Sequence, residues 1–176
     1  NGNRNMRLFS CLLYKFEIFT FDNPGMTAFV TYNNNRFEMY FDKSFISNNT
    51  TQELVYIILH EQCHVLNNHL ERGKNKDNRG LFNIATDHVI NDRLDSDVAK
   101  GHLNNIKVPE SRIIINYFKD KNVTAEEVYE YLLENAEYSS ETISFSIDSN
   151  GNCTQSVEGE ESNGNPQITV TLNKIK

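Results

Sequence analysis

The chain of 176 residues contains no tryptophan, only three prolines and three cysteines, and no surplus of positive charge. It also lacks any uninterrupted apolar run of the roughly 18 residues that a membrane-spanning helix needs. Lys and Arg number 17 against 24 Asp and Glu, which gives a formal net charge of −7 and a pI of about 5.2. This balance excludes a nucleic-acid binder that relies on a general basic surface, and it argues against binding to anionic membranes.

The three cysteines, Cys11, Cys63 and Cys153, are odd in number, and a chain of this length does not depend on disulfide bonds to hold its core. They favour a reducing compartment, so we expect a cytoplasmic protein. A content of 38% hydrophobic and 11% aromatic residues indicates that most of the chain folds.

The negative charge is concentrated near the C-terminus. Residues 122–173 include ten acidic residues and no Lys or Arg, whereas the residues before them hold 14 acidic and 15 basic ones. Beyond Ser139 the composition changes to Ser, Asn, Gly and Glu around two alternating runs, 142–147 and 167–172, and Asn150-Gly151 is a hairpin turn signal. We therefore expect a domain over residues 1–138 and an acidic, partly flexible, β-hairpin-like tail over residues 139–176.

Hydrophobic periodicity and turn signals predict a series of elements in the first domain. Thr50 and Thr124 each begin a capping box, which marks the start of a helix. The expected elements are a helix over 6–18, a hairpin of strands 27–32 and 37–41 joined by an Asn-rich turn, a helix from residue 50 to about residue 70, a helix over 81–94 and a helix after residue 124.

An HExxH motif, His60-Glu61-Gln62-Cys63-His64, lies in the middle of the helix that begins at Thr50. Side chains four residues apart differ by about 40° around a helix, so both imidazoles can reach one metal ion. Glu61 can then lie beside a metal-bound water without binding the metal, which makes it the candidate general base. Zinc lowers the pKa of such a water toward about 7 and polarises a carbonyl, and this chemistry suits peptide hydrolysis.

Catalytic zinc usually has three protein ligands, and His69 is one candidate for the third. It lies nine residues after His60, about 180° round a continuous helix, so it points away from the metal unless the chain breaks at Asn67-Asn68. The spacing therefore favours a surface or helix-end role for His69.

The helix expected over 81–94 offers Asp87 and His88 as further candidates. His88 falls on the apolar stripe of this helix, which is typical of a core histidine and less often of a metal ligand. Asn91 follows Asp87 by one turn and could orient a ligating carboxylate. Spacing alone does not separate Asp87 from His88.

Together these segments resemble a metallopeptidase domain of bacteria and phages that often precedes a von Willebrand A-type domain. The resemblance covers roughly residues 8–136 and rests on the HExxH motif, on His69 and Arg72 after it, and on the segment N-I-A-x-D-x-x-I-N at residues 83–91. It implies a zinc-dependent metallopeptidase in which Asp87 is the third ligand and Asn91 orients its carboxylate.

The resemblance also implies an α+β fold of the minimal zincin type, with a small antiparallel sheet packed on the HExxH helix and on the ligand-bearing helix after it. Its edge strand, here Phe37–Phe41, would lie above the motif helix and bind a peptide or protein substrate in extended form. Cys63 replaces a usual aliphatic residue and is expected to pack away from the metal. In a bacterial or phage context the acidic tail could inhibit the site, dock on a protein partner or take part in virion assembly.

A second function, from another class, is a catalytically silent metal-binding scaffold or interaction module, for example a phage structural or accessory protein. The intact Glu61 argues against it, and a purely structural zinc site prefers four closed protein ligands. Tyr117, Tyr129 and His102 could stabilise an oxyanion, but they are interpreted as packing or surface residues.

Overall fold

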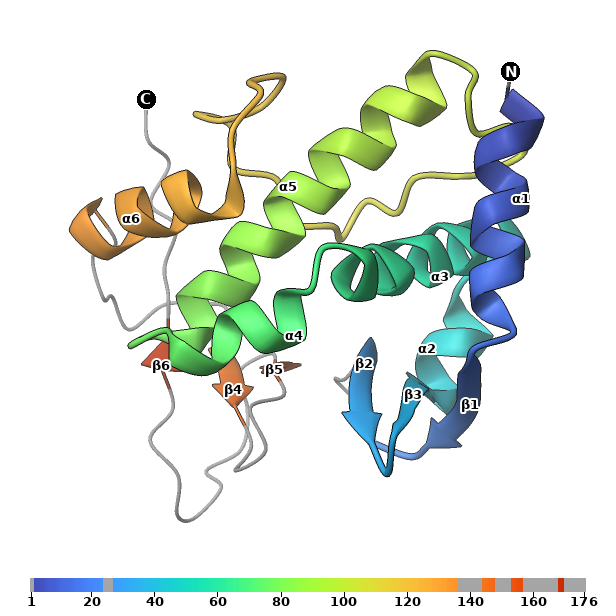
Figure 1. The fold of residues 1–176 in the computed structure, drawn as a ribbon, viewed down its shortest axis with the longest axis horizontal. Helices are drawn as coiled ribbons and strands as arrows, with labels where there is room; N and C mark the ends of the chain where they lie inside the picture. The colour runs from blue at the N-terminus through green and yellow to red at the C-terminus, as the bar shows by residue number, and fades with distance from the viewer. Residues whose placement is uncertain (1, 24–26, 136–143, 148–152, 157–167, 170–176) are drawn as a thin grey trace.

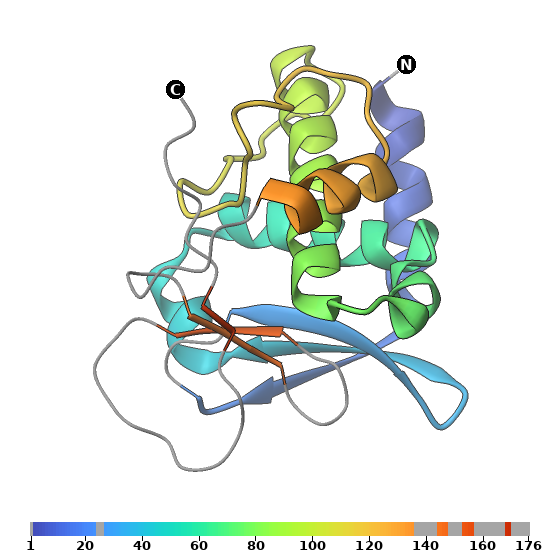
Figure 2. The ribbon, with the colours of Figure 1, turned by 90° about the vertical axis from the view of Figure 1, so that its left-hand side faces the viewer.

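The computed structural model describes residues 2–23, 27–135, 144–147, 153–156 and 168–169. These form the α+β fold that was expected, with helices gathered on one side of a small sheet (Figures 1 and 2). The elements in chain order are α1 (Gly2–Leu13), β1 (Phe16–Phe21), β2 (Ala28–Asn33), β3 (Arg36–Asp42), α2 (Lys43–Asn48), α3 (Thr51–Leu66), α4 (His69–Arg72), η1 (Gly73–Asn75), α5 (Arg79–Ala99), α6 (Ala125–Asn135), β4 (Ser144–Ile147), β5 (Cys153–Ser156) and β6 (Ile168–Thr169).

The expected hairpin is confirmed as β2 and β3, which pair in antiparallel register from Ala28↔Phe41 to Asn33↔Arg36. Its turn places Asn34 and Asn35 at φ of 46° and 64°. Asparagine tolerates this left-handed conformation better than most residues do, which explains why an Asn-rich segment turns the chain here.

The sheet differs from the expectation because a third strand, β1, pairs in parallel with β3. The strand order is β1-β3-β2, so the sheet is mixed, β3 is central and β2 is an edge strand. The helix expected over 6–18 ends at Leu13, since the next residues, FEIFTF, suit a strand and find a partner in β3. The edge strand beside the motif helix is therefore β2, not Phe37–Phe41.

Helix α3 carries the HExxH motif and packs on the sheet. Its N-terminus has the capping box that the sequence predicts, formed by Thr50 and Glu53. Val30 and Met39 of the sheet are buried in a cluster that also includes Ile57 of α3. Figure 2 shows the β1–β3 sheet lying beneath the helices, with β2 on the side of α3.

Helix α3 ends at Leu66, four residues earlier than expected. Asn68 adopts φ of 54°, a left-handed conformation that stops the helix, and α4 begins at His69. Side chains add hydrogen bonds to the carbonyls at this end, because Asn67 Nδ2 donates to the carbonyl of Cys63 and Arg72 Nη1 donates to the carbonyl of Asn67. The break redirects the chain directly after the motif.

Helix α5 is the longest helix among the described residues and crosses α3 (Figure 1). Its first half packs against α6 through Leu81 and Val128, and its second half packs against α3 through Ile90 and Tyr56. Because both ends of α5 are held in core clusters, the residues at its middle are fixed relative to the motif helix.

The strands of the tail form a second sheet in which β4 pairs antiparallel with both β5 and β6. Strands β4 and β6 fall within the runs expected over 142–147 and 167–172, whereas the expected turn at Asn150-Gly151 lies outside the described residues. The division into a domain over 1–138 and a tail over 139–176 stays a prediction. Within the described ranges, no helix has both the length and the apolar character needed to cross a membrane.

Candidate metal site

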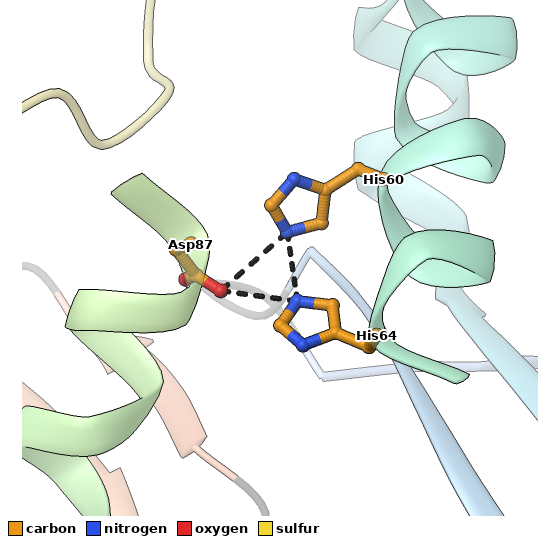
Figure 3. A group of neighbouring side chains, drawn as sticks. All are labelled: His60, His64 and Asp87. Atoms are coloured by element: carbon orange, nitrogen blue, oxygen red, sulfur yellow. Dashed lines mark hydrogen bonds and ion pairs between the residues drawn. The ribbon is translucent and has the colours of Figure 1, made fainter. Parts of the chain in front are cut away.

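Three side chains from two helices converge between α3 and α5 (Figure 3). His60 and His64 project from α3, and Asp87 projects from α5 to face them. The two Nε2 atoms are 3.0 Å apart, and Asp87 Oδ1 lies 3.5 Å from His60 Nε2 and 3.1 Å from His64 Nε2. Among the described residues, these three are the His, Cys, Asp or Glu side chains whose ligand atoms lie close enough together to hold a metal ion.

The size of this triangle fits a tetrahedral zinc site. Ligands at roughly 2.0–2.1 Å from a zinc ion at tetrahedral angles lie about 3.3 Å from one another. The three observed separations, 3.0, 3.1 and 3.5 Å, fall on both sides of this value. Little rearrangement is therefore needed for the three atoms to bind one ion.

The hydrogen bonds of His60 direct its Nε2 atom toward metal binding. Its Nδ1 lies 2.9 Å from Asn91 Oδ1, while Asn91 Nδ2 donates to the carbonyl of Ile113 at 3.0 Å, which fixes the orientation of the amide. Because Oδ1 only accepts, His60 Nδ1 carries a proton, which leaves Nε2 as the ring nitrogen that a metal ion can bind when it takes the place of the Nε2 proton. Burial disfavours the charged imidazole, but the Asp87 carboxylate outweighs it and raises the pKa of His60.

The position of Asn91 differs from the expectation in one respect. Its contact is with a histidine ligand, His60, and not with the carboxylate of Asp87. The other oxygen of that carboxylate, Oδ2, lies 3.4 Å from Asn83 Nδ2. Although burial opposes it, the hydrogen bonds from His60 and His64 hold the pKa of Asp87 below its ordinary value, so this side chain is an anion.

His69 lies on the far side of the His64 ring from Asp87. Its Nδ1 is 3.2 Å from His64 Nδ1, and its side chain is buried with 6% exposure. Burial first, then the charges of His64 and Arg72, lowers the pKa of His69 to about 3, so this imidazole is neutral at pH 7. The break at Asn68 brings His69 back to the motif as a neighbour of a ligand rather than as a ligand.

Glu61 is buried beside the two histidines, with 6% exposure. Burial raises the pKa of its carboxyl, and the nearby His64 and His60 oppose this shift without cancelling it. The backbone N–H of Val30 in β2 donates a hydrogen bond to the carboxylate. Glu61 therefore faces the edge strand at a point next to the candidate ligands.

The other candidates lie elsewhere. His88 is fully buried, its Nδ1 accepts from the backbone N–H of Ile115, and its ring packs near Phe118. Cys63 packs in the α3–α5 core as expected, and burial raises the pKa of its thiol to about 12. Tyr117, Tyr129 and His102 do not line the cavity at the histidines.

A cavity of about 210 Å³ opens over His60, Glu61, His64 and Asp87. A second hollow of about 480 Å³ adjoins it and shares His64, Leu70 and Asn83 with it. Strand β2 lines both, through residues 28–30 in the first and Thr31 and Tyr32 in the second. The two hollows thus follow the edge strand, the first at the metal-binding group and the second next to it.

Two side chains of the site were missed in the sequence. Asn83 is part of the 83–91 segment and lies one turn before Asp87, so the helical spacing of the motif could have identified it. Arg112 lines the cavity from the irregular segment between α5 and α6, where no periodic signal locates it.

A comparison with protein-family models matches residues 8–170 to a family described as "Putative metallopeptidase domain". The matched range extends beyond residue 138, where the sequence suggested a domain boundary, and includes the described strands β4, β5 and β6. No curated protein matches the chain, and no solved structure matches it either.

Proposed function

Because the chain belongs to the family described as "Putative metallopeptidase domain", we propose that it is a zinc-dependent peptidase whose general base is Glu61. The observation that carries the proposal is the convergence of His60 Nε2, His64 Nε2 and Asp87 Oδ1 next to this buried glutamate. Two histidines with one carboxylate, and a fourth position left for substrate or water, form the ligand set of catalytic rather than structural zinc sites.

The proposed reaction needs one contribution from the metal and the rest from the chain. A bound zinc ion would act as a Lewis acid that lowers the pKa of water and polarises the scissile carbonyl. Glu61 takes a proton from the attacking water and returns it to the leaving amine as the C–N bond breaks. Its buried position favours this role, because burial raises the pKa of the carboxyl and so makes the carboxylate a better proton acceptor.

We propose that the substrate binds in extended form along the free edge of β2. The amide of Asp42 donates to the carbonyl of Thr27, so the odd-numbered residues of this segment point their backbone N–H and C=O groups toward β3. Even-numbered ones, Ala28, Val30 and Tyr32, then turn their N–H and C=O groups away from β3, in agreement with the bond from Val30 to Glu61. A peptide added to this edge would pass directly over the metal-binding group.

The test combines metal dependence with a single substitution. Purified protein is expected to cleave peptides, to lose activity in a chelator and to regain it with zinc. Glu61→Gln should lower kcat by about 10²-fold or more, since it removes the general base, while zinc content stays at one ion per chain. Retained zinc without cleavage of any peptide by the wild type would favour the metal-binding scaffold instead, and full activity in Glu61→Gln would refute the role of Glu61.

A further inference from the structure

The segment that connects α5 with α6 contributes to the wall of the cavity over the metal-binding group. The residues of this segment that line the cavity are Pro109, Ser111, Arg112 and Ile113. Among the described residues that line the cavity, Arg112 is the only one with a Lys or Arg side chain. A cation that lines this cavity and takes no part in holding the metal is a candidate to contact the substrate.

Arg112 is held by two hydrogen bonds from its guanidinium. Its Nε donates to Asp95 Oδ2 at 2.7 Å, and its Nη1 donates to the carbonyl of Pro109 at 3.1 Å. Its Nη2 makes no hydrogen bond to any described residue. The side chain is 26% exposed, which leaves it accessible from the cavity.

The anchor of Arg112 is itself fixed in the core. Asp95 Oδ1 accepts a hydrogen bond of 2.9 Å from the hydroxyl of Tyr56, a fully buried side chain. Burial first, and then the charge of Asp95, raises the pKa of Tyr56, so its hydroxyl stays a neutral donor. A guanidinium that is oriented in this way can accept a second carboxylate with little further loss of side-chain entropy.

The spacing on α5 relates Arg112 to the metal-binding group. Asp87, Asn91 and Asp95 are four residues apart and share one face of the helix: the first faces the histidines, the second bonds to His60, and the third holds Arg112. Eight residues of helix span about 12 Å. An extended peptide advances about 3.3 Å per residue, so about three to four residues cover this distance.

We infer that Arg112 binds a carboxylate of the substrate, a few residues from the scissile bond, and that it thereby selects which peptides are cleaved. The inference rests on the proposed function and names a substrate class for it. The carboxylate has two sources in a peptide, the free C-terminus and an acidic side chain. Both present the planar pair of oxygens that a guanidinium edge recognises.

The experiment measures binding, so that it does not depend on cleavage. Zinc-loaded Glu61→Gln protein is titrated with three peptides of one sequence: one with a free C-terminus, its C-terminal amide, and an amide in which one Gln, scanned along the peptide, is replaced by Glu. A carboxylate at the right position is expected to lower Kd by about tenfold to a hundredfold, in line with a charge-assisted hydrogen bond. Which peptide shows the gain identifies the source of the carboxylate.

Arg112→Gln in the same background should abolish this difference, so that all peptides bind as the plain amide does. Arg93→Gln is the matched control, because Arg93 also pairs with an aspartate of α5, Asp97, but is 79% exposed and does not line the cavity. If Arg112→Gln does not fold, Arg112→Lys keeps the charge without the fork and should reduce the gain several-fold. Two results overturn the inference. One is equal affinity for the carboxylate and amide peptides in the parent protein, and the other is a gain in affinity from the carboxylate that persists in Arg112→Gln. Carboxylate selectivity without cleavage by the wild type would refute the peptidase alone.

Discussion

The contact between His69 and His64 leads to a quantitative prediction for zinc affinity. A metal ion at His64 Nε2 leaves the proton on His64 Nδ1, and the neutral His69 accepts it through its own Nδ1 at 3.2 Å. Replacing His69 by Phe fills the same space beside Phe82, whose ring centroid lies 6.3 Å from that of His69, but it removes the acceptor. The buried N–H of His64 is then left without a partner.

The expected cost follows from that lost partner. An unsatisfied buried donor costs about 1–3 kcal/mol, which corresponds to a factor of about 5 to 150 in an equilibrium constant. Residues that orient a metal-binding histidine typically contribute 10–100-fold to metal affinity, which is the same range. We therefore expect His69→Phe to weaken zinc binding by about 10- to 100-fold, and His69→Asn, whose amide oxygen can accept the same proton, to weaken it much less.

The assay is a zinc titration of the metal-free protein in competition with a chromophoric chelator at pH 7. His102→Phe is the control, because the imidazole of His102 is 48% exposed and bonds to Asp97, outside the cavity. Zinc binding by His69→Phe within twofold of the wild type, or an equal loss of affinity in the control, would refute the role of His69 as the acceptor.

Two further predictions concern stability. The hydrogen bond from Lys107, followed by those from Thr50, lowers the pKa of Glu53 to about 2, below its ordinary value of 4.5. The ionised Glu53 therefore stabilises the folded protein fully above about pH 4.5, and this stabilisation is lost as the pH falls toward 2. Urea unfolding between pH 6 and 3 should therefore show a weaker loss of stability on acidification in Glu53→Gln than in the wild type; equal pH profiles would contradict this. Leu81 is fully buried between α5 and α6, so Leu81→Ala should lower the free energy of unfolding by about 2–5 kcal/mol, as measured by denaturant titration, and a loss below 1 kcal/mol would show that the packing there is not tight.

Much of the site could be predicted from local sequence signals. The capping box at Thr50 fixes where α3 begins, and the four-residue spacing of His60 and His64 then fixes the common face of their imidazoles. Asp87 is a different case, because its spacing in the sequence does not distinguish it from His88 as the third ligand. The packing of α5 separates them: His88 points to the core around Phe118, and Asp87, one residue earlier, points to α3.

What could not be predicted depends on tertiary contacts. The parallel pairing of β1 with β3 is a long-range choice that leaves no periodic pattern, so Phe16 and its neighbours were assigned to a helix. The contact of Asn91 with His60 likewise requires knowing how α3 and α5 cross. His69 is intermediate, because two consecutive asparagines at 67 and 68 are compatible with a left-handed break, but only the structure shows that the break occurs.

A crystal structure of the zinc-loaded protein would show whether the metal site is open on one side, as a catalytic site must be. We expect zinc to be bound to His60, His64 and Asp87, with no fourth protein ligand and with the remaining position facing Glu61. A zinc ion closed by a fourth side chain of the protein, or bound away from these three residues, would contradict it.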